Sequence, residues 1–546
     1  MLHKNTFSIS HLTPLLIFGI CLVYLGLSYN YGLRTDDEGY LLAGITRILS
    51  GHIPYIDFPE NYSPGQFYLF AALFKRFGPD LLLIRRFWVL LNALSAVLAY
   101  LVARRVAPAW AALIPALLVC VVPAPVHKSF FLFIPLLNLY ATALYLEKRV
   151  GPFRLGFLAG GTILFRQDVG SVGVLVGLAA IFVDAMRSQH QSACNSGDKK
   201  QGRRRYTPFF LGILCSLLPL FVYYGIHSGI GELVSQLLFA GLKANKGKPL
   251  PYPNAIFLIR HIFTRPSLYF LIVFYAPLVL YALSLILIIK NIAEKNVPLS
   301  ASFHAMILLS GLLIFPQVLI RSDFSHISQV LPPVYLLIAY WIARSGNSAR
   351  DKSAAPATRL LNATFSVLLI ASVLYVAVFN VFLFQNQRSP FFTRFSREHD
   401  YKTLDNPRAR VLIPYTMCEI LSLVVRQVTT HTCAGDYLIA MPYAPIFNFL
   451  TGRPNPSRYD IFLPGEMDGS EAQQRAIILS MENPRLIYVI MDDQPQSGMD
   501  AQQIKNTIPD VHRYIAGHFA LEKVVGPYRI LRRTDADTHC ADHQEP

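Results

Sequence analysis

The sequence is short of charge. Asp, Glu, Lys and Arg together make up 15% of its 546 residues, whereas 53% are hydrophobic. Soluble domains carry roughly 25% charged residues, so this deficit excludes an ordinary soluble globular protein. Apolar runs of about 17 to 25 residues, each long enough to cross a bilayer, explain the composition. The sequence therefore predicts a polytopic α-helical membrane protein with about eleven transmembrane helices.

Motifs for metals, ATP and dinucleotides are also missing. The sequence contains no His-Glu-x-x-His, no Cys-x-x-Cys pair, no Gly-x-x-x-x-Gly-Lys-Ser/Thr loop and no Gly-x-Gly-x-x-Gly turn. These patterns supply zinc ligands or cradle phosphates, so we predict no metal site and no nucleotide cofactor. A divalent cation that assists a reaction stays open.

The apolar runs define the candidate spans, which are 12–28, 87–103, 109–125, 128–146, 153–165, 169–184, 208–227, 267–289, 301–320, 327–343 and 360–384. The fifth and sixth are short and are separated only by Arg166-Gln167-Asp168. They form either two spans, one helix or a re-entrant pair. The choice matters because it changes the parity of the topology.

Basic residues set the orientation. If the fifth and sixth spans are separate, one side collects Arg104-Arg105, Lys148-Arg149, Arg187 to Arg205, Lys290 with Lys295, and Arg344 to Arg359. Short basic loops stay in the cytoplasm, so we expect a multi-pass inner (plasma) membrane protein with a cytoplasmic N-terminus and an extracytoplasmic C-terminal domain. These segments and their contact with membrane lipids account for the net charge of +16, so no nucleic-acid partner is expected.

Three consecutive acids follow the first span. Asp36, Asp37 and Glu38 lie a few residues beyond the apolar run Leu12 to Leu27, where the chain emerges from the membrane. Crowded carboxylates repel one another, which raises their pKa values and favours a general base. We therefore predict Asp36, Asp37 and Glu38 as the candidate catalytic residues.

The rest of this first outer loop is patterned too. Apolar residues recur at helical spacing from Gly39 to Leu49, which predicts an amphipathic helix lying in the membrane interface, and a second short helix is expected from Gln66 to Phe77. Between them, residues 52–65 are rich in Pro and aromatic residues and predict an ordered loop.

The loop resembles a known family. Asp37-Glu38-Gly39-Tyr40, Ala43, Ile48, Gly51 and the stretch with Tyr55, Asp57, Phe58 and Pro64 are similar to the first extracytoplasmic loop of the C-type (GT-C) integral-membrane glycosyltransferases, in the branch of the protein O-mannosyltransferases and bacterial aminoarabinose transferases. The resemblance implies transfer of a sugar from a polyprenyl-phosphate carrier to a glycan, lipid or protein acceptor on the non-cytoplasmic face. The family's acidic pair maps onto Asp37 and Glu38, and the extra acid Asp36 leaves the base open by one position.

A sugar phosphate donor requires positive charge where its phosphate departs. The outer segments supply candidate donor- and phosphate-binding residues, which are Arg166, Arg321, Lys243, Lys246, Lys248 and His326. Asp168 and Asp323 each follow an Arg by two residues, so they are expected to orient that Arg or to bind sugar hydroxyls, and Tyr40 is expected to support the site.

The chain changes character near its C-terminal end. We expect a transmembrane domain over 1–384, with its first outer loop at 29–85, an extracytoplasmic α/β domain over 385–535 and a disordered tail over 536–546. Strands are predicted at 410–414, 437–442, 486–492 and 528–532, and helices at 415–429, 471–482 and 509–518. The irregular loop 450–459 either faces the active site or is a surface loop held by Pro.

A membrane transporter or lipid-linked sugar flippase is the alternative function. Transport predicts ionisable residues near the middle of spans and often an inverted repeat. The candidate spans are nearly free of charge at mid-depth and show no repeat, which favours the enzyme.

The charge pattern makes a testable prediction about topology. A reporter fused after Arg204 should be cytoplasmic, and one fused after Asp468 should be extracytoplasmic, because the basic loops hold their own side inside. Reporter activity that distinguishes the two compartments measures this. Two reporters on the same side would mean that the number of spans is wrong, with the division at Arg166 as the first place to look.

Overall fold

The protein is seen in a computed structural model that describes residues 9–122, 128–192, 200–240, 250–294, 298–383, 400–495, 499 and 505–536. Its internal contacts divide the chain into two compact units. One, the helical unit, comprises Met1–Tyr29, Arg86–Tyr223 and Leu250–Ser396. The other, the mixed unit, comprises Asn30–Arg85, Tyr224–Pro249 and Arg397–Pro546. Residues of the first outer loop thus belong to the same unit as the C-terminal segment.

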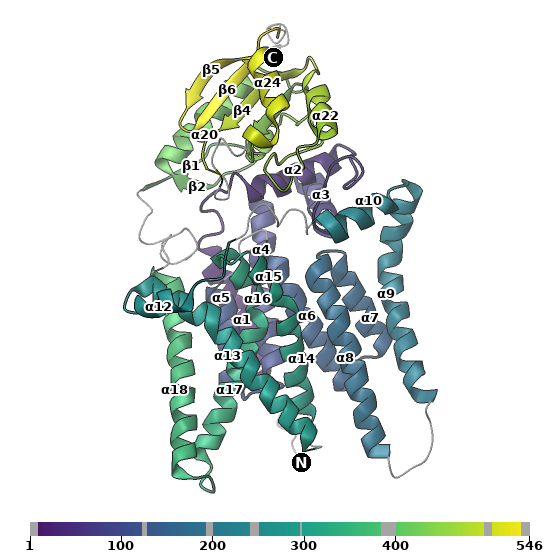
Figure 1. The fold of residues 1–546 in the computed structure, drawn as a ribbon, viewed down its shortest axis with the longest axis vertical. Coiled ribbons are helices and arrows are strands. Elements are labelled where there is room, and N and C mark those ends of the chain that lie inside the picture. Colours follow the sequence, from purple (N-terminus) through teal and green to yellow (C-terminus); the bar gives the residue numbers. More distant parts are fainter. Residues whose placement is uncertain are drawn as a thin grey trace, which may run out of the picture. The chain divides into compact units, whose positions relative to one another are not determined.

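The helical unit is a bundle of long apolar helices together with several short helical segments (Figure 1). They are α1 (Ile9–Gly26), α4 (Leu81–Ala103), whose first turn belongs to the mixed unit, α5 (Ala109–Val121), α6 (Ser129–Leu146), α7 (Pro152–Ile163), α8 (Gln167–Ser192), α9 (Lys200–Ile226), α12 (Ala255–Arg260), α13 (Arg265–Ala293), α14 (Leu299–Ile314), α15 (Pro316–Ile320), α16 (Phe324–Val330), α17 (Pro332–Arg350) and α18 (Pro356–Val378), which continues as the π-helical turn η4 (Phe379–Leu383).

Every predicted span is helical over most of its length, which confirms a polytopic helical protein. Among the described residues, seven helices are long and apolar enough to cross a membrane, or eight if the bent pair α16 and α17 is one span. Two further apolar helices, Leu12–Gly26 and Ala109–Val121, are shorter. The fifth and sixth candidate spans are two separate helices, α7 and α8, that pack against each other.

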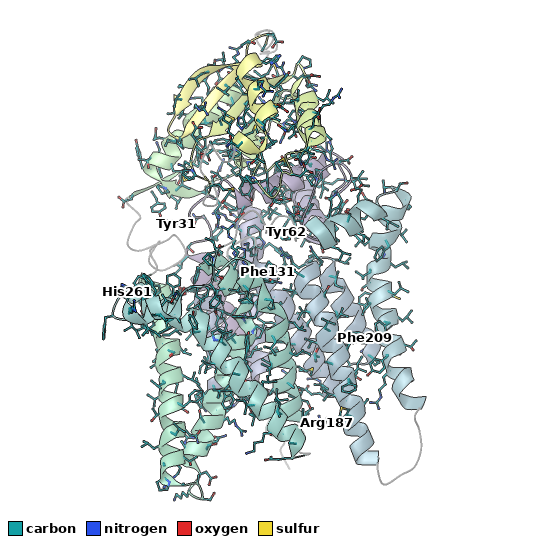
Figure 2. All side chains as sticks on the ribbon, viewed as in Figure 1. Tyr31, Tyr62, Phe131, Arg187, Phe209 and His261 are labelled. Carbon is teal, nitrogen blue, oxygen red and sulfur yellow. The ribbon has the colours of Figure 1, made fainter. Side chains whose placement is uncertain are left out.

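Close packing explains why the bundle carries glycine. A Cβ atom at Gly156 of α7 would lie 2.0 Å from the carbonyl oxygen of Phe209 in α9, and one at Gly160 would lie 2.2 Å from Ser216 Oγ. Both positions therefore exclude a side chain, because the two helices approach each other through these glycines. Phe209 is one of the residues labelled in Figure 2.

In the mixed unit, the first outer loop forms two helices, α2 (Asp37–Leu49) and α3 (Gly65–Phe77). The apolar face of α2, with Leu41, Leu42 and Ile45, is buried against α3 and α21 (Ile446–Thr451). Protein therefore covers the face that the sequence predicted to lie in the membrane interface. A Cβ atom at Gly39 would lie 2.4 Å from the backbone nitrogen of Ile446, so glycine permits this close approach.

The remaining elements of the mixed unit include both helices and strands. They are α10 (Ile230–Ser235) and the π-helical turn η2 (Gln236–Ala240), then β1 (Tyr401–Thr403), β2 (Leu412–Pro414), α20 (Tyr415–Thr430), β3 (Tyr437–Met441), α22 (Glu471–Met481), β4 (Leu486–Asp492), α24 (Pro509–His518), β5 (Phe519–Val525) and β6 (Tyr528–Arg533).

The larger sheet has the order β3-β4-β6-β5, in which β3 and β4 are parallel and the other neighbours are antiparallel. A smaller sheet pairs β1 with β2. The predicted strands and helices are confirmed to within two residues at each end, whereas the sequence did not predict β1, β5 and α21. The sequence from Phe519 to Val525 does not alternate between apolar and polar residues, so it gives no period-two signal for a strand. In the structure, five of these seven residues are exposed.

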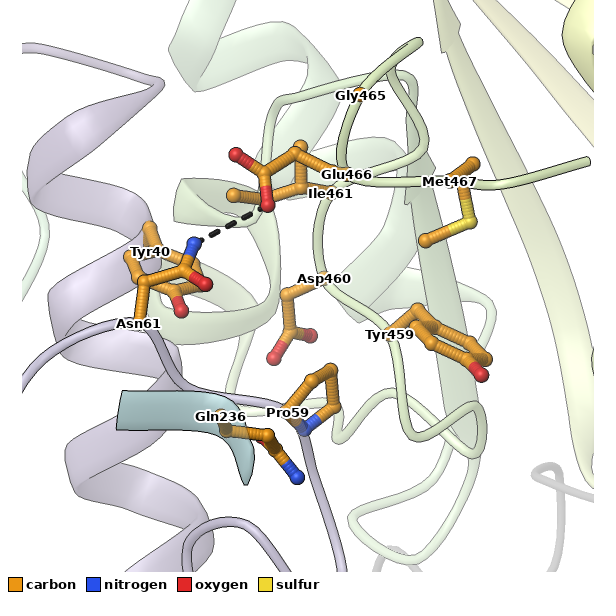
Figure 3. Close-up of a pocket in the computed structure, with 10 residues that line it drawn as sticks. All are labelled: Tyr40, Pro59, Asn61, Gln236, Tyr459, Asp460, Ile461, Gly465, Glu466 and Met467. Atoms are coloured by element: carbon orange, nitrogen blue, oxygen red, sulfur yellow. Dashed lines mark hydrogen bonds between the residues drawn. The ribbon is translucent and has the colours of Figure 1, made fainter. Parts of the chain in front are cut away.

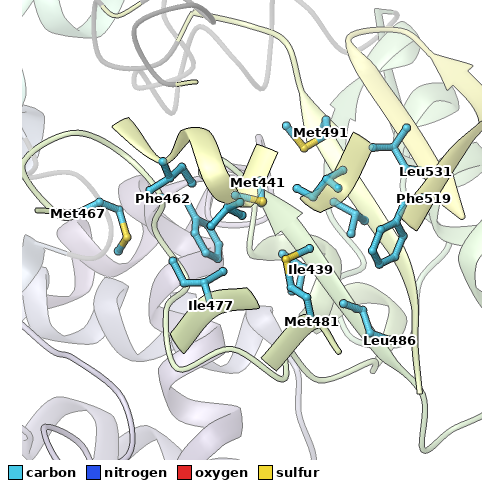
Figure 4. Packing of buried hydrophobic residues seen from close by; sticks show 14 residues of the cluster. Ile439, Met441, Phe462, Met467, Ile477, Met481, Leu486, Met491, Phe519 and Leu531 are labelled. Atoms are coloured by element: carbon cyan, nitrogen blue, oxygen red, sulfur yellow. The ribbon is translucent and has the colours of Figure 1, made fainter. Parts of the chain in front are cut away.

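Apolar side chains of the sheet and of two helices form one core (Figure 4). Ile439 and Met441 of β3 pack with Ile477 and Met481 of α22, and Ile515 of α24 belongs to the same cluster. This core fixes the frame from which the C-terminal loops project.

Candidate functional site

The three acids predicted as catalytic occupy the start of α2. Asp37 and Glu38 lie in its first turn and Asp36 is its N-cap residue. Negative charge is favourable there because the helix N-terminus presents unpaired N–H groups and the positive end of the helix dipole. Asp36 nevertheless makes no side-chain cap hydrogen bond, since its carboxylate is used elsewhere.

Arg34 holds two of the acids. Its Nε and Nη2 donate to the two carboxylate oxygens of Asp36 at 3.1 and 2.9 Å, and Nη2 is 3.1 Å from Asp37 Oδ2. Burial opposes the charge on Arg34, but its hydrogen bonds to Asp36 and the charges of Asp37 and Glu38 raise its pKa above the ordinary value. The mutual repulsion on which the sequence argument relied is therefore offset by a guanidinium.

Glu38 points into the protein. It is 2% exposed and accepts from Arg85 Nε at 2.9 Å and Nη2 at 2.7 Å, while the backbone N–H of Arg34 donates to it at 2.9 Å. Arg85 also donates to the carbonyl oxygens of Tyr31 and Gly32. A carboxylate this enclosed is suited to positioning the start of α2 rather than to accepting a substrate proton.

Asp37 is held from the C-terminal segment. The hydroxyl of Tyr443 donates to Asp37 Oδ1 at 2.9 Å, although the two residues lie 406 positions apart. Burial and the charges of Asp37 and Asp36 raise the pKa of Tyr443 well above its ordinary value, so the phenol keeps its proton and remains a donor. The Asp37 side chain is 27% exposed, so water or a substrate can reach it.

A fourth acid belongs to the same electrostatic environment. Asp492 is the last residue of β4, and burial raises its pKa to about 6. The negative charges of Asp493 and Asp36 also raise this pKa, whereas the hydrogen bond from the backbone N–H of Gln494 lowers it. The end of the sheet therefore contributes to the negative potential around α2. The sequence did not single out Asp492 because it reads as the last residue of an ordinary strand.

Glu60 is a buried acid that the sequence analysis also missed. It is 1% exposed, and its Oε1 accepts from the backbone N–H groups of Asn61 and Tyr62 at 2.9 and 3.2 Å. Burial is the largest influence on this carboxyl and raises its pKa from 4.5 to about 8, although Tyr40 and the two N–H groups oppose the shift. Glu60 is therefore largely neutral at pH 7.

The mixed unit contains a pocket whose lining includes residues close in sequence to Asp37 and Glu60 (Figure 3). Its lining comes from the first outer loop, from the segment after α9 and from the loop before α22, and comprises Tyr40, Pro59, Asn61, Gln236, Tyr459, Asp460, Ile461, Gly465, Glu466 and Met467. Tyr40, predicted as a supporting residue, thus lines a real cavity. The two ends of the loop 450–459 differ in their surroundings. Tyr459 lines this pocket, whereas Arg453 donates hydrogen bonds to Thr432 and so holds the loop against its own unit.

The predicted cations that the structure describes lie in the helical unit. Arg166 is 3% exposed, donates to both oxygens of Asp168 at 3.2 and 2.8 Å, and places its guanidinium 3.9 Å from the ring centroid of Phe131, which Figure 2 labels. Asp168 thus orients Arg166, with the ring as a cation–π partner.

The second Arg–Asp pair is more open. Arg321 Nε donates to Asp323 Oδ2 at 2.9 Å, and the other oxygen of Asp323 lies 2.8 Å from His326 Nδ1. The Arg321 side chain is 24% exposed, against 4% for Arg166, so its guanidinium is the more accessible of the two. Lys128, which precedes α6, adds positive potential at His326.

The other expected cations, Lys243, Lys246 and Lys248, lie outside the described residues, as does most of the expected tail over 536–546. Within the described part of the chain, no three His, Cys, Asp or Glu side chains converge in a way that could hold a metal ion. The acids at α2 instead contact cationic or tyrosine partners: Arg34 binds Asp36 and Asp37, Tyr443 also binds Asp37, and Arg85 binds Glu38.

The buried acid gives a prediction about stability. Between pH 4.5 and 8 the folded protein keeps a proton on Glu60 that the unfolded chain has lost, so stability should fall as pH rises through this window. Glu60→Gln removes that penalty, and each pKa unit corresponds to about 1.4 kcal/mol. The melting temperature of Glu60→Gln relative to wild type, measured in nanodiscs from pH 5 to 9, should increase with pH. The exposed Glu482→Gln serves as control, and parallel curves for all three proteins would contradict the raised pKa.

No protein-family model matches the sequence, and no curated protein sequence matches it. Solved structures do match in fold. ArnT from Cupriavidus metallidurans bound to undecaprenyl phosphate aligns over 95% of this chain and 97% of its own, with a TM-score of 0.51 and 12% sequence identity. AglB from Archaeoglobus fulgidus, in complex with an inhibitory peptide and a dolichol-phosphate, aligns over 97% of this chain and 75% of its own, also with a TM-score of 0.51 and 12% identity.

ArnT is an aminoarabinose transferase and AglB an oligosaccharyltransferase, and both are C-type glycosyltransferases. The alignments extend over both units of this chain rather than over a single helical hairpin. The chain therefore has the fold of the C-type integral-membrane glycosyltransferases, as the resemblance in its first outer loop implied.

Proposed function

We propose that this protein is a membrane glycosyltransferase that moves a sugar from a polyprenyl-phosphate carrier to a glycan, lipid or protein acceptor on the non-cytoplasmic face of the inner membrane. The hydrogen bond from Tyr443 to Asp37 carries the proposal, because it joins the C-terminal segment to the acid that the family resemblance points to. Support comes from the fold shared with ArnT and AglB, whose structures contain undecaprenyl phosphate and dolichol-phosphate respectively.

The reaction requires a base and a place for a phosphate. The acceptor hydroxyl oxygen attacks the anomeric carbon of the donor sugar, the bond from that carbon to the phosphate oxygen breaks, and the hydroxyl proton passes to a carboxylate. The electron pair of the broken bond leaves with the polyprenyl phosphate. A positioned base contributes about 10² to 10⁴ in rate, and fixed cations stabilise the departing phosphate.

Asp37 is our choice for the base. Glu38 is buried and accepts hydrogen bonds from Arg85 at both carboxylate oxygens. Asp36 accepts hydrogen bonds from Arg34 at both of its carboxylate oxygens. Asp37 shares Arg34 through one oxygen and receives the Tyr443 hydroxyl at the other, so its orientation is fixed while part of its surface stays accessible. We assign donor phosphate binding to Arg321, Arg166 and His326, with Lys243, Lys246 and Lys248 as further cations.

Replacement of the base tests this assignment. Asp37→Asn retains the size of the side chain and an oxygen that can accept from Tyr443, but it cannot take up the proton. Transfer from a polyprenyl-phosphate sugar should fall by about 10² to 10⁴, while folding and donor binding persist. Transfer by purified protein in nanodiscs measures this, with Asp510→Asn, whose side chain is 42% exposed and which lies in another helix of the mixed unit, as control. If Asp36→Asn is inactive and Asp37→Asn is not, the base is Asp36; if both transfer normally, the protein is not the enzyme proposed.

Tyr443 should tune that base. A donor to the carboxylate favours its charged form, so Tyr443→Phe should raise the pKa of Asp37. The acidic limb of the kcat/KM profile should therefore move to higher pH, and transfer should fall most at low pH. Tyr437→Phe, in β3 of the same unit, is the matched control. A lower rate with an unmoved pH profile would mean that Tyr443 only supports the fold.

A further inference from the structure

The segment before α13 carries a cluster of exposed apolar side chains. Four large residues in α12 and in the turn after it are more than half exposed, namely Ile256, Phe257, Ile259 and Phe263, the last of them at 100%. We call these four side chains the α12 patch. Large apolar groups that are exposed together mark a surface that contacts a membrane or another protein.

Hydrogen bonds and packing hold this segment against α13. The side chain of Asn254 caps α12 by accepting from two of its backbone N–H groups at 2.9 and 3.1 Å. From α13, the hydroxyl of Tyr275 donates to the carbonyl oxygen of Pro253 at 2.5 Å. Leu258 of α12 is buried, at 6% exposure. The helix is therefore anchored on one side while the α12 patch faces outward.

The α12 patch lies where a membrane surface is expected. Phe263 lies just before Pro266–Ala293, a stretch of α13 that is long and apolar enough to cross a membrane. Exposed apolar side chains continue along that stretch, at Leu278, Val279, Leu285, Ile286 and Ile289. The α12 patch thus continues, along the chain, a surface that would face lipid.

The length of α12 and its polar end fit the membrane interface. Its six residues extend about 9 Å, whereas the hydrocarbon core is about 30 Å thick, so α12 can lie in a leaflet but cannot cross it. Arg260 and His261, which Figure 2 labels, are exposed at its end and can reach lipid headgroups while the apolar side chains enter the acyl boundary. A stable protein interface uses roughly 20 to 30 residues a side, so four side chains fit lipid better than a second protein copy.

We infer that α12 and the turn after it form an interfacial anchor, which inserts the α12 patch into the phospholipid leaflet at which α13 begins. The inference goes beyond the proposed function, and it holds whether or not the protein transfers sugar.

The anchor is joined to the turn that carries Arg321. Leu250 forms a parallel β-bridge with Arg321, and the backbone N–H of Ser322 donates to the carbonyl oxygen of Leu250 at 3.1 Å. Since Tyr275 fixes the chain between Leu250 and α12 on α13, the depth of α12 in the leaflet sets the height of Arg321. This consequence rests on the proposed function, which gives Arg321 a donor phosphate to bind.

Fluorescence quenching tests the anchor directly. Phe263→Trp in the full chain is placed in nanodiscs of phosphatidylcholine that is brominated either near the headgroup end or near the methyl end of its acyl chains, and the signal of the three native tryptophans is subtracted with wild type. The new Trp should be quenched several-fold more by the shallow bromines. Ile286→Trp, exposed on α13, should be quenched more by the deep ones, and Leu521→Trp, exposed in β5, by neither.

Two results would overturn the anchor. Emission from Phe263→Trp that is unquenched and typical of water would leave the α12 patch in solvent. Emission that is blue-shifted but unquenched would identify a protein segment, from this chain or a second copy, as its cover.

Transfer assays test the link to Arg321. Phe257→Ser combined with Phe263→Ser should raise the KM for a polyprenyl-phosphate sugar several-fold and leave kcat unchanged, while Leu521→Ser should behave as wild type. An unchanged donor KM would reject the link. Shallow quenching of Phe263→Trp in a protein that transfers no sugar would reject the proposed enzyme and leave the anchor in place.

Discussion

The ion pair between Glu38 and Arg85 is the constraint on which the site depends. Both side chains are almost fully buried, at 2% and 4% exposure, and two short hydrogen bonds join them. Removing one partner of such a pair leaves an uncompensated buried charge, which costs about 3 to 5 kcal/mol. Because Arg85 also binds the carbonyl oxygens of Tyr31 and Gly32, it fixes the chain that leads into α2 and so the direction of Asp37.

The electrostatics of the site follow from that arrangement. Acids placed side by side in sequence would repel, but Glu38 turns inward to Arg85 while Arg34 lies against Asp36 and Asp37. Glu60 avoids the problem in another way, since burial keeps it largely protonated at pH 7. The protein therefore keeps several carboxyl groups near the start of α2 without concentrating all of their charge there.

The mixed unit is assembled from segments far apart in the sequence. The first outer loop, the stretch after α9 and the C-terminal segment share one set of contacts, and each contributes to the pocket. Two contacts join the first outer loop to the C-terminal segment. They are the ion pair between Arg47 and Asp460, which are 413 residues apart, and the hydrogen bond from Tyr443 to Asp37. The α/β elements thus act as a scaffold that presents two loops, 442–445 and 452–470, to the helices of the outer loop.

The sequence by itself determined the elements. Apolar runs and period-two strands depend on local pattern, so the helical spans, α2, α3 and most strands of the C-terminal segment could be predicted, and the acids at Asp36 to Glu38 stood out by position. The sequence could not predict which acid is enclosed, which is accessible and which has a tyrosine partner. These differences come from Arg85, which binds Glu38 across 47 residues, and from Tyr443, which binds Asp37 across 406 residues. Glu60 escaped notice for the same reason: its raised pKa comes from burial, which no local pattern of residues reports. Tertiary structure decided the site because long-range contacts set the environment of each charge.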